Sequence, residues 1–197
     1  MRIRTLFRSI TTTAIALVLI PSFAQSTQPF GLDLHGHPIR QLAGPGTRIV
    51  VLIFAASDCP ISNRYVPEIA RLNQEFSGKG IKFWWVFPNA TDSAAVVSRH
   101  NRDFSIRENT VLDPHQSLVA LAQATVTPEA AVFLVQNGSM RELYNGRVDD
   151  RYLSIGQERP QPQRHELEDA IAAALDGKPI PQPGGPPVGC SIVFLQK

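Results

Sequence analysis

A continuous apolar run from Ile49 to Phe54 constrains the fold of this chain more than any other feature. A strand with one solvated face alternates apolar and polar residues, whereas this run has no polar position, so both of its faces must be buried. That pattern predicts the central strand of a mostly parallel sheet. Directly after it, from Pro60 to Phe76, apolar residues recur every three or four positions, which predicts a helix.

The rest of the chain extends this α/β pattern. We predict a short hairpin around 30–42, strands at 81–87, 111–112, 130–135 and 141–144, helices at 91–100, 116–123 and 164–175, and a linker without regular structure at Pro179–Pro187. Thr91 or Asp92 is the expected cap of the second helix. Strands that alternate with helices and end in a hairpin predict a central mixed sheet flanked by helices.

The N-terminus has the features of a secretory signal peptide. Arg2, Arg4 and Arg8 precede an apolar stretch, and small residues at Ser22 and Ala24 predict cleavage before Gln25. The alternative is a membrane anchor, but the stretch is short for a hydrocarbon core of roughly 30 Å. We therefore expect a periplasmic or secreted protein with no stable membrane span after cleavage. The predicted units are a signal peptide (1–24), one domain (25–178), and a linker with a cysteine-containing tail (179–197).

Charge excludes one class of partner. Cleavage removes three arginines and no acids, leaving sixteen Lys and Arg against seventeen Asp and Glu, a mature net charge of −1. The sequence has no basic patch with interleaved aromatic residues. We therefore expect no nucleic-acid partner.

The two cysteines are the candidate reactive residues. Cys59 falls between the predicted central strand and its helix, and the N-terminus of a helix stabilises a thiolate, which is the reactive form of cysteine. This predicts faster alkylation of Cys59 than of Cys190. The alternative is that both are inert, small apolar residues. An exported chain also permits a disulfide between them.

Four segments together resemble a known family. They are Phe54–Ser62 around Cys59, Thr127-Pro128-Glu129 before a strand, Tyr144–Asp150 after a hairpin, and Pro187–Ile192 around Cys190. In this order they resemble the peroxiredoxin-like proteins of the thioredoxin fold, also called the redoxin or alkyl hydroperoxide reductase/thiol-specific antioxidant family. The resemblance covers roughly Phe30 to Phe194. It implies a thioredoxin-like fold, a nucleophilic Cys59, and a substrate groove at Thr127 and Pro128, the latter in cis.

Three positions depart from that family. Peroxiredoxins place a threonine three residues before the nucleophile, where this chain has Ala56. Thioredoxins have a buried acid at the position of Ile53, and dithiol members have a second cysteine at the position of Ser62. Cys190 is therefore the remaining candidate for a resolving thiol.

Other polar residues are secondary candidates. Ser62 and Arg64 follow the cysteine on the same helix and could support its thiolate. Asp149-Asp150 with Arg147 resembles a loop of that family, but the alternative of an exposed charged turn is the one we expect. The five histidines are scattered, so we expect no metal site and no cofactor.

These observations give two hypotheses. The first is an exported thiol-based oxidoreductase that acts on a disulfide or a peroxide through Cys59, with Cys190 resolving the intermediate; its partner is a thiol/disulfide redox protein or peroxide. The alternative is a non-catalytic thioredoxin-fold binding protein in which a Cys59–Cys190 disulfide is structural.

Overall fold

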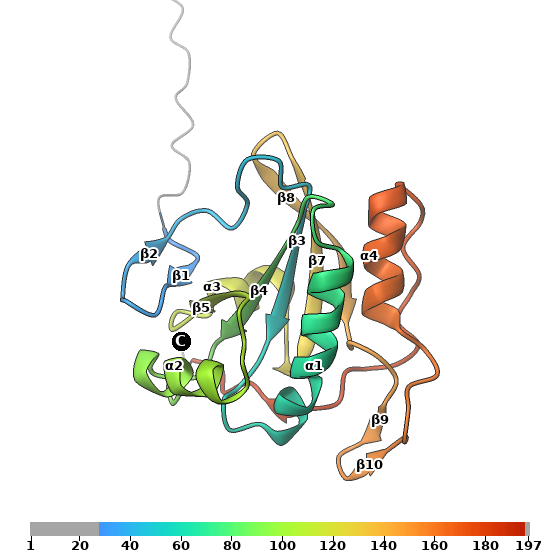
Figure 1. Cartoon of the computed structure of the whole chain (residues 1–197). Helices are drawn as coiled ribbons and strands as arrows, with labels where there is room; N and C mark the ends of the chain where they lie inside the picture. The colour runs from blue at the N-terminus through green and yellow to red at the C-terminus, as the bar shows by residue number, and fades with distance from the viewer. Residues whose placement is uncertain (1–27, 196–197) are drawn as a thin grey trace, which may run out of the picture.

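A mixed seven-stranded sheet forms the centre of the protein (Figure 1). The computed structural model describes residues 28–195; the predicted signal peptide and its cleavage site lie outside the described residues. The strand order is β2-β1-β5-β4-β3-β7-β8. The bounds are β1 Gly31–Leu32, β2 Pro38–Ile39, β3 Ile49–Phe54, β4 Ile81–Phe87, β5 Asn109–Leu112, β7 Glu129–Gln136 and β8 Ser139–Gly146.

The predicted central strand is confirmed. Every residue of β3 is buried, and β3 pairs in parallel with β4 and antiparallel with β7. β5 continues the parallel part, and β8 forms the predicted hairpin with β7. The apolar run thus has neighbours on both edges and packed layers on both faces, as its lack of polar positions requires.

Helices cover both faces of the sheet (Figure 1). They are α1 Pro60–Glu75, α2 Ala94–Asp103, α3 Ser117–Ala122 and α4 Glu166–Asp176. One core lies between the sheet and α1, α4 and Val97 of α2, and the other lies between the opposite face and α3. Within residues 28–195, no helix combines the length and the apolar character needed to cross a membrane.

The start of α2 differs from the prediction. Ser93 is the cap, and its side chain accepts a hydrogen bond from Val96 N. Asp92, one of the two expected caps, instead accepts hydrogen bonds from the backbone and side chain of Ser57. The carboxylate is therefore used to hold the loop before Cys59 rather than the helix.

The C-terminal tail returns to the domain. Residues 178–189 contain no helix or strand, as predicted, and β11 (Cys190–Ser191) then pairs antiparallel with β6 (Val126–Thr127). Ile192 is buried in the second core, and Gln116 bonds the backbone of Val193 and Leu195. Contacts of the residues that follow Cys190 in the chain therefore anchor the tail.

A second small hairpin was not predicted. β9 (Tyr152–Ser154) and β10 (Gln157–Glu158) form it, and it projects from the lower edge of the domain in Figure 1. Leu153 and Ile155 are exposed on it. We call residues 152–158 the β9–β10 hairpin.

Candidate redox site

The junction of β3 and α1 fixes the position of Cys59. Cys59 is the N-cap residue of α1; its N–H donates to Ala56 O, and its carbonyl accepts from Asn63 N. Pro60 occupies the first turn of the helix, where a missing N–H leaves no bond unmade. The sulfur is thus held at the helix N-terminus, where the helix dipole favours a negative charge.

The Thr127–Pro128 loop faces this sulfur. The peptide bond between the two residues is cis, and Cys59 Sγ donates to Thr127 O at 3.1 Å. The structure therefore brings Thr127, one of the two groove residues taken from the family resemblance, into direct contact with the first cysteine, and the cis bond to Pro128 follows it.

The tail places the second cysteine at the same point. Cys190 pairs with Thr127 in the β11–β6 ladder, and its side chain lies close enough to that of Cys59 to lower the pKa of the Cys59 thiol. Both thiols are free. Cys59 is only 1% exposed beneath the tail, whereas Cys190 is partly exposed. Access to solvent therefore favours Cys190, in opposition to the predicted alkylation preference for Cys59.

Gly189 permits this close approach. A Cβ atom at this position would lie 2.1 Å from Thr127 O and 3.0 Å from Pro128 N. Both are backbone atoms, so a side chain could fit only if the tail or the loop moved. Gly189 therefore belongs to the site. Its position directly before Cys190 is the one sequence feature that could have indicated this.

The two sulfurs have opposite electrostatic surroundings. Burial tends to raise the pKa of Cys59, but hydrogen bonds from Cys190 and from the backbone and side chain of Ser62 together hold that pKa below its usual value. Burial, the hydrogen bond to Cys59 and the charges of Cys59 and Asp58 raise the pKa of Cys190 to about 12. Of the two thiols in the reduced pair, Cys59 is therefore the one that ionises first as the pH rises.

This pairing predicts a widely split titration. In the reduced protein, thiolate absorbance near 240 nm should rise in two separate steps, the first from Cys59 and the second, near the upper end of the accessible pH range, from Cys190. Because the pKa of Cys59 is lower in the folded protein, its contribution to stability is present above the unfolded pKa. That contribution is lost as pH falls through the folded pKa. Two coincident titrations near pH 8.5 would contradict the pairing.

Ser62 provides a matched test of the lower titration. Its hydroxyl is buried and has no hydrogen-bond partner among the described residues, which leaves it available to the Cys59 sulfur when that sulfur ionises. Ser62→Ala should raise the lower pKa by about one unit, since a hydrogen bond to a charged group is worth about 1.5–3 kcal/mol. Ser77→Ala, in the exposed turn that follows α1, is the control and should leave the titration unchanged.

Arg64 has a different environment from the one expected. Its side chain is 59% exposed, and Nη2 lies 4.0 Å from Glu158 Oε1 on the β9–β10 hairpin. An exposed pair of this kind contributes little to stability. We therefore assign Arg64 to the contact between α1 and the hairpin rather than to support of the thiolate.

A buried polar network lies behind Cys59 and was missed at the sequence level. Asn63 donates to Ser57 O and contacts His100 Nε2 through its side-chain oxygen. Ser57 in turn donates to Asp92, whose pKa is raised by burial. These contacts fix the loop and first helical turn that carry the cysteine.

The prediction that Asp149-Asp150 forms an exposed turn is wrong. Both carboxylates are buried: Asp149 accepts from Tyr65 Oη and Arg151 N, and Asp150 accepts from Gln163 N and Arg164 N. Backbone donors compensate the buried charges. This corner sets the direction in which the chain leaves toward the β9–β10 hairpin.

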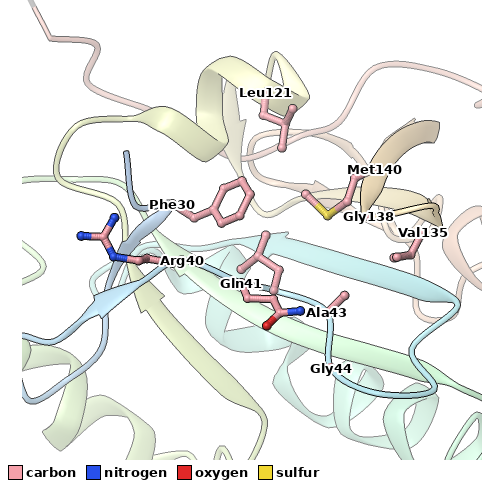
Figure 2. Close-up of a pocket in the computed structure, with 10 residues that line it drawn as sticks. Phe30, Arg40, Gln41, Ala43, Gly44, Leu121, Val135, Gly138 and Met140 are labelled. Atoms are coloured by element: carbon pink, nitrogen blue, oxygen red, sulfur yellow. The ribbon is translucent and has the colours of Figure 1, made fainter. Parts of the chain in front are cut away.

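A pocket of about 350 Å³ opens beside Cys190, and we call it the hairpin pocket. Its lining is mainly apolar and joins the start of α1 to the hairpin and the tail: Pro60, Ile61, Tyr152, Ile155, Gly156, Glu158, Gly189 and Cys190. Another pocket, of about 500 Å³, lies between Phe30, Leu121 and Met140 and has no cysteine in its lining (Figure 2). Of these two pockets in the described part of the chain, the hairpin pocket is therefore the one that adjoins a thiol.

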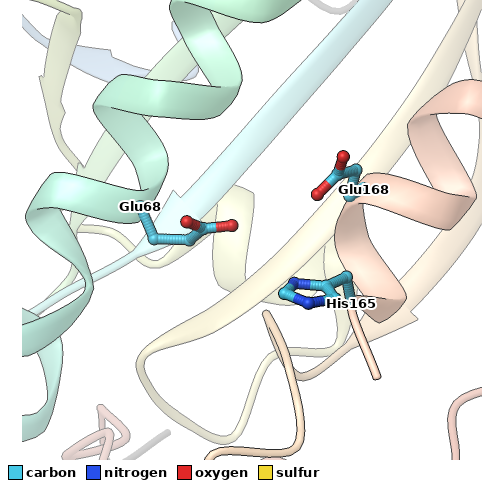
Figure 3. Close-up of side chains that lie close together, drawn as sticks. All are labelled: Glu68, His165 and Glu168. Atoms are coloured by element: carbon cyan, nitrogen blue, oxygen red, sulfur yellow. The ribbon is translucent and has the colours of Figure 1, made fainter. Parts of the chain in front are cut away.

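One cluster within residues 28–195 has the composition of a metal site. Glu68, His165 and Glu168 gather between α1 and α4, with one ligand atom from each lying within 4.8 Å of the others (Figure 3). Arg71 forms ion pairs with both glutamates. Its guanidinium already occupies the space between them, so we interpret the cluster as an ion-pair network joining the two helices.

Comparison with known proteins identifies the fold. No protein-family model and no curated protein matches the sequence. A crystal structure of an uncharacterized conserved protein from Geobacillus kaustophilus is similar, with a TM-score of 0.69 and 21% identity over 88% of this chain and 92% of that one. A hypothetical protein from Sinorhizobium meliloti gives 0.63 and 20% over 75% and 80%.

A third structure, of a candidate thioredoxin from Neisseria meningitidis, gives a TM-score of 0.52 and 18% identity over 73% of this chain and 85% of that one. At these identities the likeness concerns the fold alone. Together with the mixed sheet and its flanking helices, it establishes a thioredoxin-like fold.

Proposed function

We propose that this protein is an exported thiol-disulfide oxidoreductase, acting in the periplasm or outside the cell, whose redox pair is Cys59 and Cys190. The observation that carries the proposal is that two free thiols meet at Thr127: Cys59 Sγ bonds Thr127 O, Cys190 pairs with Thr127, and the nearby Cys190 lowers the pKa of Cys59. A thiolate beside a second thiol is the arrangement that disulfide exchange requires.

The chemistry follows from the pair. When the two thiols are oxidised they lose two electrons and two protons and form one Cys59–Cys190 disulfide. A substrate dithiol reverses this change through a mixed disulfide and leaves as a disulfide itself. Both steps use only cysteine sulfurs, so the proposal needs no cofactor.

Disulfide exchange is favoured over peroxide reduction. Ala56, a buried methyl group, stands where peroxiredoxins place a threonine hydroxyl near the peroxide. Cys59 is also covered by the tail, which leaves little room for peroxide to reach it. We therefore place a dithiol or disulfide of another protein, rather than peroxide, as the substrate.

The proposal is tested by oxidation followed by exchange. Treatment with a small disulfide should lower the mass of the monomer by two hydrogens, and peptide mapping should link Cys59 to Cys190. The oxidised protein should then oxidise a reduced protein substrate rapidly. The reduced protein should consume hydrogen peroxide much more slowly than that. Two free thiols after oxidation would refute the pairing, and a disulfide that no dithiol can reduce would favour the alternative of a structural bond.

A further inference from the structure

We infer that an incoming substrate thiol attacks the sulfur of Cys190 rather than that of Cys59, and that the hairpin pocket receives an apolar side chain adjacent to the substrate cysteine. The inference rests on the proposed function. It assigns the mixed disulfide to the tail cysteine, opposite to the assignment that the family resemblance implies.

Cys190 is more accessible than Cys59. Thiol-disulfide exchange requires the attacking sulfur to approach the attacked sulfur directly, so access decides which sulfur reacts. Cys59 is 1% exposed and lies under the tail against Thr127 O. Cys190 is partly exposed and lines the hairpin pocket. A thiol that enters this pocket therefore meets Cys190 first.

Cys59 is the better leaving group of the two cysteines. The sulfur that departs as the better-stabilised thiolate leaves faster. Hydrogen bonds from Ser62 and the position at the start of α1 stabilise the Cys59 thiolate, whereas burial and nearby negative charge raise the pKa of Cys190. Attack on Cys190 with departure of Cys59 thus uses the better leaving group.

A substrate thiolate forms a bond to Cys190 Sγ, the Cys59–Cys190 bond breaks, and Cys59 takes the electron pair as thiolate. The second substrate thiolate attacks the substrate sulfur of the mixed disulfide. The substrate disulfide forms, and Cys190 leaves and takes up a proton. The substrate loses two electrons, and the protein gains them; a disulfide of another molecule then reoxidises the protein.

The lining of the pocket defines the substrate side chain. Ile61, Tyr152 and Ile155 surround the space beside Cys190, and Glu158 is held at its edge by contacts with Arg64 and Tyr152. Ile155 is 75% exposed in the free protein. An aliphatic or aromatic side chain next to the substrate cysteine would cover this surface and gain free energy by leaving water. A pocket of about 350 Å³ holds one such side chain.

The experiment traps the mixed disulfide. Oxidised wild-type protein is mixed with either of two blocked peptides, each with one cysteine preceded by leucine or by serine, and the reaction is quenched with acid within seconds. Peptide mapping should find the adduct on Cys190, with Cys59 free, in at least tenfold excess over the reverse. The leucine peptide should react about tenfold faster than the serine peptide, the ratio expected from partial burial of one leucine.

Two hairpin variants test the pocket. Ile155→Ser should remove most of the preference for leucine, because it takes away an apolar wall that is exposed and so not needed for folding. Leu153→Ser is the matched control: Leu153 is 53% exposed on the same hairpin but does not line the pocket. It should keep the preference.

The outcomes separate the inference from the proposed function. A protein that forms the disulfide but carries the peptide on Cys59 overturns the assignment to Cys190 and leaves the proposed function intact. A Cys190 adduct with equal rates for both peptides, or equal effects of the two variants, overturns the role of the pocket. If no Cys59–Cys190 disulfide forms at all, the proposed function itself fails.

Discussion

Replacing Gly189 with alanine is expected to detach the tail from β6 and expose the thiol of Cys59. The added Cβ would lie 2.1 Å from the backbone oxygen of Thr127, and neither backbone can accept that overlap. Alkylation of Cys59 by iodoacetamide should rise at least tenfold over wild type. The alkylation rate should be measured at pH 9. Loss of the Cys190 side chain as a neighbour raises the pKa of Cys59, and at this pH that rise lowers the fraction of reactive thiolate only slightly. The Cys59–Cys190 disulfide should form correspondingly more slowly.

Gly185 supplies the matched control. It lies in the same segment, but a Cβ there would meet only the end of the Arg147 side chain, at 3.0 Å. A flexible guanidinium can move aside, so Gly185→Ala should leave the alkylation of Cys59 at the wild-type rate. Equal rates for wild type and Gly189→Ala would mean that the tail does not cover Cys59 in solution.

Replacing Cys190 with serine is expected to stop turnover. Without the second sulfur no intramolecular disulfide can form, so oxidation of a substrate dithiol should fall by roughly a hundredfold or more, to the background rate. Serine is close to cysteine in size and can still donate to Cys59. The free energy of unfolding of the variant should therefore differ by less than about 1 kcal/mol from that of the reduced wild type and from that of the oxidised wild type.

The stability measurement distinguishes the catalytic from the structural interpretation. A permanent disulfide typically contributes about 2–4 kcal/mol. A redox-active one contributes less, because the reduced form is itself stabilised by the Cys59 thiolate. Denaturant unfolding of oxidised wild type and of Cys190→Ser decides between them. A difference of about 2–4 kcal/mol, together with unimpaired substrate oxidation by the variant, would identify a structural bond.

Local sequence was sufficient for the part of the site built on regular structure. The unbroken apolar run of β3 and the helical spacing after Pro60 placed Cys59 at the start of α1, where it lies. Strong periodicity of this kind depends on the burial of each residue and not on distant partners.

The parts that could not be predicted depend on tertiary contacts. Cys59 is buried because a tail that begins more than a hundred residues later lies over it. The charge of Asp149 predicts exposure to solvent, but Tyr65 and a backbone N–H supply its partners inside the protein. The β9–β10 hairpin has only short strands with polar and exposed residues, so its sequence carries little periodic signal.

Residues on both sides of Cys190 bind the domain: Gly189 contacts the Pro128 loop, and Ile192 is buried in the second core. Docking of the tail and oxidation of the thiols are therefore two linked equilibria. Thermodynamic reciprocity requires that docking favours the disulfide by the same factor by which the disulfide favours docking. Any molecule that competes for the edge of β6 will consequently shift the protein toward its reduced form without touching either sulfur.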